Sequence, residues 1–310
     1  MKLVHQPVLL KEVLDGLNLH PGDTVIDGTV GLGGHAAAVW QRIAPDGRLL
    51  AIDRDEQNLK LARERLSPFG GRIAFAQGSY ADVKKLAYEH AISSARGILL
   101  DLGYASSHVE DPARGFSFQN EGPLDMRYDV SQELTADTLV NLGTQDELAD
   151  IFRRYGEERQ ARKIAQAIYT ARRKEQFKTT TQLADFIAGL MPRRGRIHPA
   201  TKIFQALRIV VNDELGELER ALPELVDMLE GGGRLAVISF HSLEDRLVKQ
   251  FIKKQAETGA GENLTKRVIT PSKEEVRSNP RARSAKIRIF EKYDGNSAHN
   301  QTPSGRHGDG

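Results

Sequence analysis

The stretch TVIDGTVGLGGH at residues 24–35 decides the fold of this chain. Its first four residues, 24–27, form a short apolar run that ends in Asp27, and a glycine-rich turn then leads into the helix-like run AAAVW. A second apolar run ends in Asp53. Glycines let a backbone turn tightly and approach a ligand that a Cβ atom would exclude, and a carboxylate that closes the next strand suits a ribose diol. The pattern predicts a cofactor that contains a nucleoside.

Two cofactors fit this turn. The glycine spacing at residues 31–36, with Asp53 about 20 residues further on, can be matched to the dinucleotide fingerprint G-x-G-x-x-G/A. However, Asp27 stands directly before the turn, as in the first motif of S-adenosylmethionine (SAM) methyltransferases, with Thr29 where a glycine often stands. A carboxylate there opposes a pyrophosphate but suits a cationic sulfonium and ammonium. This favours SAM; a dinucleotide, or a glycine-rich turn without a ligand, is the alternative.

The composition fits a soluble globular protein of one or two domains, with 310 residues, 39% hydrophobic and 28% charged. No apolar run approaches the ~20 residues that a membrane span needs, and the N-terminus lacks the apolar core of a signal peptide. The chain has no cysteine, which excludes disulfides, thiolate zinc sites and a cysteine nucleophile. We therefore expect a cytoplasmic protein with no membrane partner.

Basic residues are concentrated in one part of the chain. Residues 151–208 hold 14 Lys and Arg against 4 Asp and Glu, so this block carries +10 although the whole chain carries only +2. A basic block on a mildly acidic body suggests a polyanion such as a nucleic acid as its partner. Arginines that are merely solvated or paired on helices are the alternative.

Apolar runs alternate with helical stretches along the chain, which predicts a doubly wound α/β sheet. Ligands bind beyond the carboxyl ends of the strands in such sheets, and three of the expected strands end in aspartate, at Asp27, Asp53 and Asp101. Three carboxylates on one edge of a sheet indicate a site. The further runs lie at residues 72–76, 97–101, 234–239 and 285–290.

The alternation is interrupted in the middle of the chain. Residues 106–129 have the turn signals of a loop, and apolar stripes with helical spacing follow at residues 148–155 and 183–190. These stripes predict a helical insert that coincides with the basic block. The expected domains are a discontinuous core at residues 1–105 and 211–293, an inserted helical domain at 106–210 and a disordered tail at 294–310.

Asp101 is the candidate catalytic residue. The lone pair of an exocyclic amine on a nucleobase is delocalised into the ring, so an acceptor must draw on its N–H as the nitrogen becomes tetrahedral. Asp101 can accept that hydrogen bond, and its charge also suits a sulfonium. A strand-end aspartate that only caps a turn is the alternative.

Two other kinds of site are not supported. Ser239, His241 and Asp245 lie within one strand-to-helix corner, and no G-x-S-x-G elbow precedes them, so we do not expect a hydrolase triad. His35, His198 and His241 are not accompanied by a carboxylate–histidine helix motif, so we expect no metal.

The chain resembles the bacterial small-subunit rRNA cytosine-N4 methyltransferases of the RsmH or MraW type. Seven segments carry the resemblance in order and extend it over about residues 5–290. They are the turn from DGT at 27–29 to GGH at 33–35, GFSF at 115–118, GPLDMR at 122–127, HPAT at 198–201, FQALRI at 204–209, SFHSLEDR at 239–246 and NPRARSAK at 279–286.

The resemblance implies a Rossmann-like SAM-dependent methyltransferase core with an inserted all-helical substrate-recognition domain. It implies methyl transfer to N4 of a cytidine in the decoding (P-site) region of 16S rRNA, on the assembled small ribosomal subunit. The absence of cysteine independently argues against attack on C6 of the base, the route to C5-methylcytosine. A homodimer is compatible with the sequence, which does not fix the oligomeric state.

Carried over by position, the resemblance also implies the site residues. The cofactor contacts would be Gly33, Gly34, His35, Asp53, Tyr80, Asp101 and His108, with Asp53 on the ribose hydroxyls and Tyr80 beside the adenine. The candidate substrate contacts are Arg127, His198, Ser239 and His241 in the matching segments, and Arg193, Arg194 and Arg196 in the basic block.

The sequence departs from the family pattern after residues 101–103. The family usually reads VSSPQ there, whereas this chain has YASSH, which puts the role of His108 in doubt and brings Tyr104 either near the cofactor and target base or into simple packing. Glu56 replaces a common proline, with little expected effect. The rival functions are an NAD(P)-dependent oxidoreductase, a non-catalytic RNA-binding or ribosome-assembly factor, and a DNA amino-methyltransferase.

Overall fold

The computed structural model describes residues 6–191 and 198–294, which form two compact units. Within those limits, the sheet unit comprises Met1–Asp53, Leu61–Gly103 and Glu219–Gly310, and the helical unit comprises Arg54–Lys60 and Tyr104–Leu218. The units differ from the expected domain bounds mainly at residues 54–60 and 211–218, which lie in the helical unit. Arg193, Arg194, Arg196 and all of the expected tail except its first residue lie outside the described residues.

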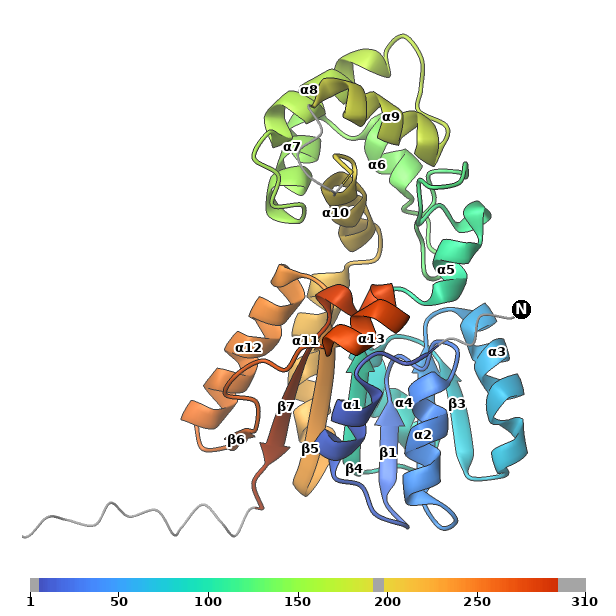
Figure 1. Ribbon diagram of the computed structural model, residues 1–310, viewed down its shortest axis with the longest axis vertical. Coiled ribbons are helices and arrows are strands. Elements are labelled where there is room, and N and C mark those ends of the chain that lie inside the picture. Colours follow the sequence, from blue (N-terminus) through green and yellow to red (C-terminus); the bar gives the residue numbers. More distant parts are fainter. Residues whose placement is uncertain (1–5, 192–197, 295–310) are drawn as a thin grey trace, which may run out of the picture. The chain divides into compact units, whose positions relative to one another are not determined.

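The sheet unit contains a seven-stranded sheet with the order β3-β2-β1-β4-β5-β7-β6 (Figure 1). The first five strands in this order are parallel, and β7 is antiparallel to both of its neighbours. This confirms the predicted Rossmann-like α/β fold. The strands are β1 (Thr24–Asp27), β2 (Arg48–Asp53), β3 (Ile73–Gln77), β4 (Ala95–Asp101), β5 (Leu229–Ser239), β6 (Gly261–Asn263) and β7 (Lys286–Lys292).

Helices cover both faces of this sheet. Successive residues of its central strands are therefore buried, for example Ile98, Leu99 and Leu100 of β4. Among the described residues, no helix combines the length and the apolar character that crossing a bilayer would require. Two of the helices, α3 and α11, begin in the helical unit and continue in the sheet unit. The helices are α1 (Leu10–Leu17), α2 (Gly34–Ile43), α3 (Glu56–Leu66), α4 (Val83–Glu89), α11 (Glu214–Met228), α12 (Ser242–Glu257) and α13 (Lys273–Ser278).

The structure corrects one local expectation and adds two features. The glycines at residues 231–233 lie within β5, where the pairing with β4 is irregular between Ala95 and Gly97. The short strand β6 has only three residues and too little apolar character to be read from the sequence. The expected loop at 106–129 contains the short helix α5 (Ser106–Glu110).

The helical unit has its own apolar core. The two stripes expected to be helical form part of it, with Leu148 and Phe152 of α7 and Leu183 and Ile187 of α9 fully buried. The predicted helical insert is thus a separately packed body. Its further helices are α6 (Ala136–Leu142), α7 (Gln145–Arg154), α8 (Ala161–Ala171), α9 (Thr180–Leu190) and α10 (Thr201–Val211).

Candidate functional site

Three aspartates lie at the carboxyl edge of the sheet. Asp27, Asp53 and Asp101 are the last residues of β1, β2 and β4, and these three strands are neighbours with β1 in the centre. Because parallel strands end at the same edge, the three carboxylates gather where ligands of doubly wound sheets bind.

The glycine-rich turn is fixed by the second of these aspartates. The backbone N–H of Gly31 donates a hydrogen bond of 2.8 Å to Oδ2 of Asp53, and Gly31 and Gly33 have positive φ angles of 51° and 74°. A Cβ atom at Gly28 would come within 2.6 Å of Leu100 Cδ2. The turn leads into α2, whose first N–H groups have no acceptor within the helix and suit an anionic group of a ligand.

Thr29 links the other two aspartates. Its backbone N–H donates to Oδ1 of Asp27 over 3.2 Å, and its Oγ1 accepts a hydrogen bond of 2.6 Å from the backbone N–H of Asp101. The threonine at a position where methyltransferases often have glycine therefore ties the ends of β1 and β4 together.

Burial destabilises the ionised forms of Asp27 and Asp101, so both carboxyl groups are partly protonated near neutral pH. Oδ2 of Asp27 and Oδ1 of Asp101 are buried and have no hydrogen-bond partner there. Burial raises the pKa of Asp27 to about 7, although the hydrogen bond from the Thr29 N–H lowers it; Asp53 adds a smaller raising contribution. Burial, Asp27 and Glu244 raise the pKa of Asp101 to about 8. A cation bound here would relieve the desolvation and the repulsion together.

His35 shares this environment. Its Nε2 lies 2.9 Å from the carbonyl oxygen of Val8, which can only accept, so Nε2 carries a hydrogen. Its Nδ1 then faces Oδ2 of Asp101 at 3.4 Å. A proton between these two atoms can belong to either residue, so His35 is part of the polar site at the strand ends.

The remaining candidates of the sheet unit lie near the ends of β3 and β5. Tyr80 begins a short 3-10 helix after β3, and its Cβ is 3.1 Å from the place of a Cβ at Gly28. Ser239 ends β5 with its Oγ buried and without a hydrogen-bond partner among the described residues. His241 caps α12: its Nδ1 accepts from the N–H of Glu244, whose Oε2 accepts in return from the N–H of His241. This capping box explains His241 and Glu244 of the SFHSLEDR segment.

His108 belongs to the helical unit, where both of its ring nitrogens are engaged. Nδ1 accepts from the backbone N–H of Ala105 at 3.1 Å, so Nε2 donates to Oδ2 of Asp55 at 2.7 Å. Arg114 Nη1 also donates to this oxygen, at 2.6 Å. Burial alone would raise the pKa of Asp55, but the hydrogen bonds from His108 and Arg114 hold it at about 2. This buried, compensated triad gives His108 a structural task, and its contact with a cofactor stays a prediction.

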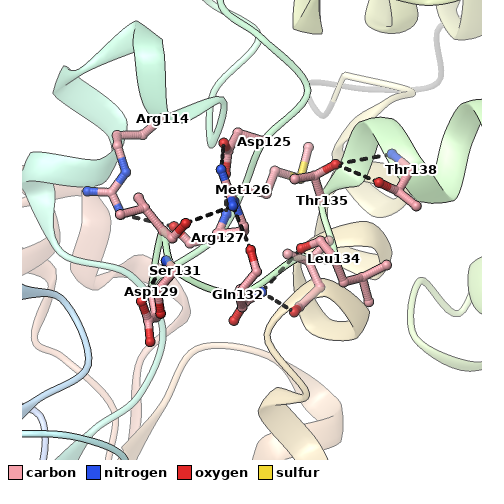
Figure 2. A network of polar contacts seen from close by, with 12 residues as sticks. Arg114, Asp125, Met126, Arg127, Asp129, Ser131, Gln132, Leu134, Thr135 and Thr138 are labelled. Carbon is pink, nitrogen blue, oxygen red and sulfur yellow. Dashed lines mark hydrogen bonds and ion pairs between the residues drawn. The ribbon is translucent and has the colours of Figure 1, made fainter.

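Arg127 is held by its own loop (Figure 2). Its Nε and Nη2 donate to the two carboxylate oxygens of Asp125 at 2.9 and 2.8 Å, and its Nη1 donates to the carbonyls of Val130 and Gln132 at 2.8 and 2.6 Å. Four of the five guanidinium hydrogens are thus used, and the part of Arg127 in substrate binding stays a prediction.

Of the four remaining predicted substrate residues, His198 is the one that the structure describes. The His198 ring packs against the Phe118 ring at a tilt of 37°, with ring centroids 4.8 Å apart, and its Nδ1 accepts from the N–H of Ala200 just before α10. Arg193, Arg194 and Arg196 lie outside the described residues, so their part in RNA binding stays a prediction.

The sequence reading missed the charged pair that orders Tyr104. Arg208 binds Glu214 through Nε and Nη2 at 2.7 and 2.9 Å, and its guanidinium carbon lies 4.8 Å from the centroid of the Tyr104 ring. The six-residue spacing of Arg208 and Glu214 spans the end of α10 and the start of α11, so no helical periodicity could reveal the pair.

Comparison with known proteins identifies the family of this chain. The MraW methylase family matches residues 2–293. A ribosomal RNA small subunit methyltransferase H from Cyanothece sp. is 48% identical over 294 residues, which cover 94% of this chain and 96% of that protein. The protein of the same name from Coprothermobacter proteolyticus is 46% identical over 288 residues, with coverages of 93% and 96%. An rRNA methylase of known structure from Streptococcus thermophilus is 14% identical, with a TM-score of 0.43 and coverages of 92% and 93%. On the family match and the two curated relatives, this chain belongs to the MraW methylase family.

Proposed function

We propose that this chain is a SAM-dependent methyltransferase of small-subunit rRNA that methylates the exocyclic N4 of one cytidine in the decoding (P-site) region of 16S rRNA. The observation that carries the proposal is the pair of buried, uncompensated carboxylates, Asp27 and Asp101, beside the glycine turn. Family membership and relatives named ribosomal RNA small subunit methyltransferase H support the substrate class.

The residues at the strand ends fit SAM better than a dinucleotide. A pyrophosphate would meet two carboxylates, Asp27 and Asp101, whereas a sulfonium and an ammonium would neutralise them. The first N–H groups of α2, at Gly34 and His35, would hold the carboxylate of the methionine part. Asp53 would take the ribose hydroxyls while one of its oxygens fixes Gly31. When bound, SAM supplies an electrophilic methyl group.

Asp101 would act on the amine of the target base. Its Oδ1 lacks a hydrogen-bond partner among the described residues, so it can accept the N4–H and draw electron density to the nitrogen as it becomes tetrahedral. We propose direct attack by N4 on the methyl carbon, without a covalent intermediate on the enzyme. The proton that leaves N4 can pass to Asp101, whose raised pKa of about 8 suits a base near neutral pH. His35 Nδ1, 3.4 Å away, would share that proton.

The helical unit would recognise the RNA. Its basic block, which includes Arg193, Arg194 and Arg196 outside the described residues, would contact phosphates and make binding salt-dependent. The target cytidine must be unpaired or splayed out to reach a pocket. We further propose that the substrate is the assembled small subunit, that the protein acts in the cytoplasm where subunits are, and that a homodimer is compatible with this activity.

Methyl transfer itself tests the proposal. Labelled SAM is offered to small subunits from a strain that lacks this gene and, in parallel, to naked 16S rRNA, and the product nucleosides are identified by mass spectrometry. The expected product is N4-methylated cytidine at a single site, with subunits preferred over naked rRNA. SAM binding without transfer to either substrate would favour a non-catalytic assembly factor, and NADH binding in place of SAM would favour an oxidoreductase. DNA is offered as a third substrate, and transfer to DNA alone would make the chain a DNA amino-methyltransferase.

A further inference from the structure

We infer that residues 266–283, here called the rim segment, form a second RNA-binding surface that contacts phosphates beside the site of methyl transfer. The inference rests on the proposed function, since it names how the substrate reaches Asp101. It places RNA contacts in the sheet unit as well as in the basic block of the helical unit.

The topology of the sheet brings the rim segment to the catalytic edge. Strand β7 is antiparallel to β5, and its first residue, Lys286, pairs with Ser239, the last residue of β5. The residues directly before β7 therefore lie at the edge where β4 ends in Asp101. Helix α13, within the rim segment, lies at this end of the sheet unit (Figure 1).

Two hydrogen bonds anchor the rim segment to the residues around His35. Oε1 of Glu275 accepts from the backbone N–H of Leu9 at 2.7 Å, and Nδ2 of Asn279 donates to the carbonyl of Gln6 at 3.1 Å. Val8, which lies between Gln6 and Leu9 in the chain, provides the carbonyl oxygen that accepts a hydrogen bond from His35 Nε2. Residues 6–9 therefore hold both the rim segment and His35, the residue that faces Asp101.

The inner side of the rim segment is fixed. Ile269 pairs with Ile287 of β7, whose backbone N–H donates to the Ile269 carbonyl at 3.0 Å. Ala282 is fully buried. Because the inner side is held to the sheet unit, the charged side chains of the segment extend outward from a fixed backbone.

The outer side is strongly basic. The rim segment holds six Lys and Arg residues against two Glu, and one of the two, Glu275, is used in the contact with Leu9. Arg277 and Arg283 are exposed, and neither has a hydrogen bond or ion pair within residues 6–191 and 198–294. By contrast, Lys286 and Arg288, which follow on β7, both bind Asp245 at 3.2 and 2.7 Å.

A chain of phosphates is the partner that this surface fits. A cytidine whose N4 reaches Asp101 must have its neighbouring nucleotides run along the same edge of the sheet. Arginine forks bind phosphate oxygens in pairs, and Arg277 and Arg283 are available at that edge. Bound phosphates would also relieve the repulsion among the cations of the rim segment.

Charge reversal tests the inference without relying on methyl transfer. Arg277→Glu/Arg283→Glu is compared with Lys249→Glu/Lys254→Glu, which makes the same change in net charge at exposed positions of α12 in the same unit. The dissociation constant for a fluorescent RNA fragment of the 16S decoding region is measured without SAM, between about 50 and 200 mM salt. For the arginine double variant alone, we expect a loss of affinity of at least about tenfold. We also expect the slope of log affinity against log salt concentration to be smaller in magnitude by about 1.4.

The outcomes separate this inference from the proposed function. Equal affinities and slopes for the two double variants, both folded by thermal unfolding, would overturn it. So would a loss of binding to intact subunits with unchanged RNA affinity, because the rim segment would then contact a ribosomal protein. The wild type could transfer no methyl group while Arg277→Glu/Arg283→Glu still lowers RNA affinity. The proposed function would then fail, and the RNA-binding role of the rim segment would stand.

Discussion

Two buried sites, one in each unit, treat charge in opposite ways. At the strand ends of the sheet unit, Asp27 and Asp101 each keep a buried oxygen without a partner among the described residues, and their pKa values rise to about 7 and 8. In the helical unit, Asp55 is also buried, yet His108 and Arg114 compensate it and its pKa falls to about 2.

The presence or absence of a compensating partner distinguishes a binding site from a buried ion pair that only stabilises the fold. A buried charge without a partner destabilises the fold, so the strand ends are costly unless a cationic ligand is bound. A compensated charge holds chain segments together, as Asp55 joins residues 54–60 to His108 of α5 and to Arg114, which follows α5 in the chain. Perturbed pKa values alone do not distinguish these cases; the direction of the shift and the presence of a partner do.

The largest expected effect is the loss of turnover in Asp101→Asn. Without the carboxylate, neither the amine N–H nor the leaving proton has its acceptor, and we expect turnover to fall by about 10³-fold. Single-turnover methyl transfer to small subunits measures this. A folded variant with turnover within a few-fold of the wild type would remove Asp101 from the chemistry.

The next effect is on stability, in Asp55→Asn. Removing this charge leaves Arg114 buried without its counter-ion, so we expect the free energy of unfolding to fall by about 3 kcal/mol. Asp150→Asn is the matched control, because Asp150 pairs with Arg153 and Arg154 on the exposed face of α7, and such pairs contribute less than about 1 kcal/mol. Urea unfolding compares the two, and equal losses would contradict a structural role for the triad.

Asp27→Asn should act in the opposite direction to Asp55→Asn. The pKa of Asp27 is raised on folding from 3.8 to about 7, so the folded state binds more protons than the unfolded state in this range. The stabilisation that this carboxyl group provides in its protonated form is therefore lost as pH rises from about 4 to 7. We expect the ligand-free variant to be more stable than the wild type by about 1 kcal/mol at pH 8 and by less at pH 5. Thermal unfolding at both values decides, and a destabilised variant at pH 8 would contradict the account.

The smallest effect concerns Tyr104, a partly exposed contact of the helical unit. Tyr104 is 46% exposed and lies over Arg208, which Glu214 holds in place. Tyr104→Val should lower stability by about 0.5–1 kcal/mol, the value of such a cation–π contact, whereas Tyr104→Phe should keep it. Denaturant unfolding of both variants measures the difference, and an equal loss in the two would assign the effect to the hydroxyl instead.

The sequence predicted the parts of the molecule that depend on local pattern. Parallel buried strands read as apolar runs, and each run that ends in aspartate brought a carboxylate to the same edge of the sheet. The stripes at residues 148–155 and 183–190 likewise predicted helices that bury Phe152 and Ile187. Both signals lie in the order of neighbouring residues.

The sequence could not show which polar residues are already occupied. Arg127 matched the pattern of a substrate contact, but Asp125 and two carbonyls use most of its hydrogens. The bond from Asp55 to His108 joins residues 53 positions apart, and no spacing rule predicts such a pair. The sequence therefore gives the type and position of the site residues but does not give their partners.

The affinities for SAM and for its demethylated product, S-adenosylhomocysteine, test the central contrast most directly. The two ligands differ in the charge on sulfur, so calorimetry between about pH 6 and 9 isolates the response of the strand-end carboxylates to that charge. We predict that the preference for SAM increases as Asp27 and Asp101 ionise, near pH 7–8, and that Asp27→Asn reduces the increase. A preference that stays constant with pH in the wild type would show that these carboxylates do not bind a cation.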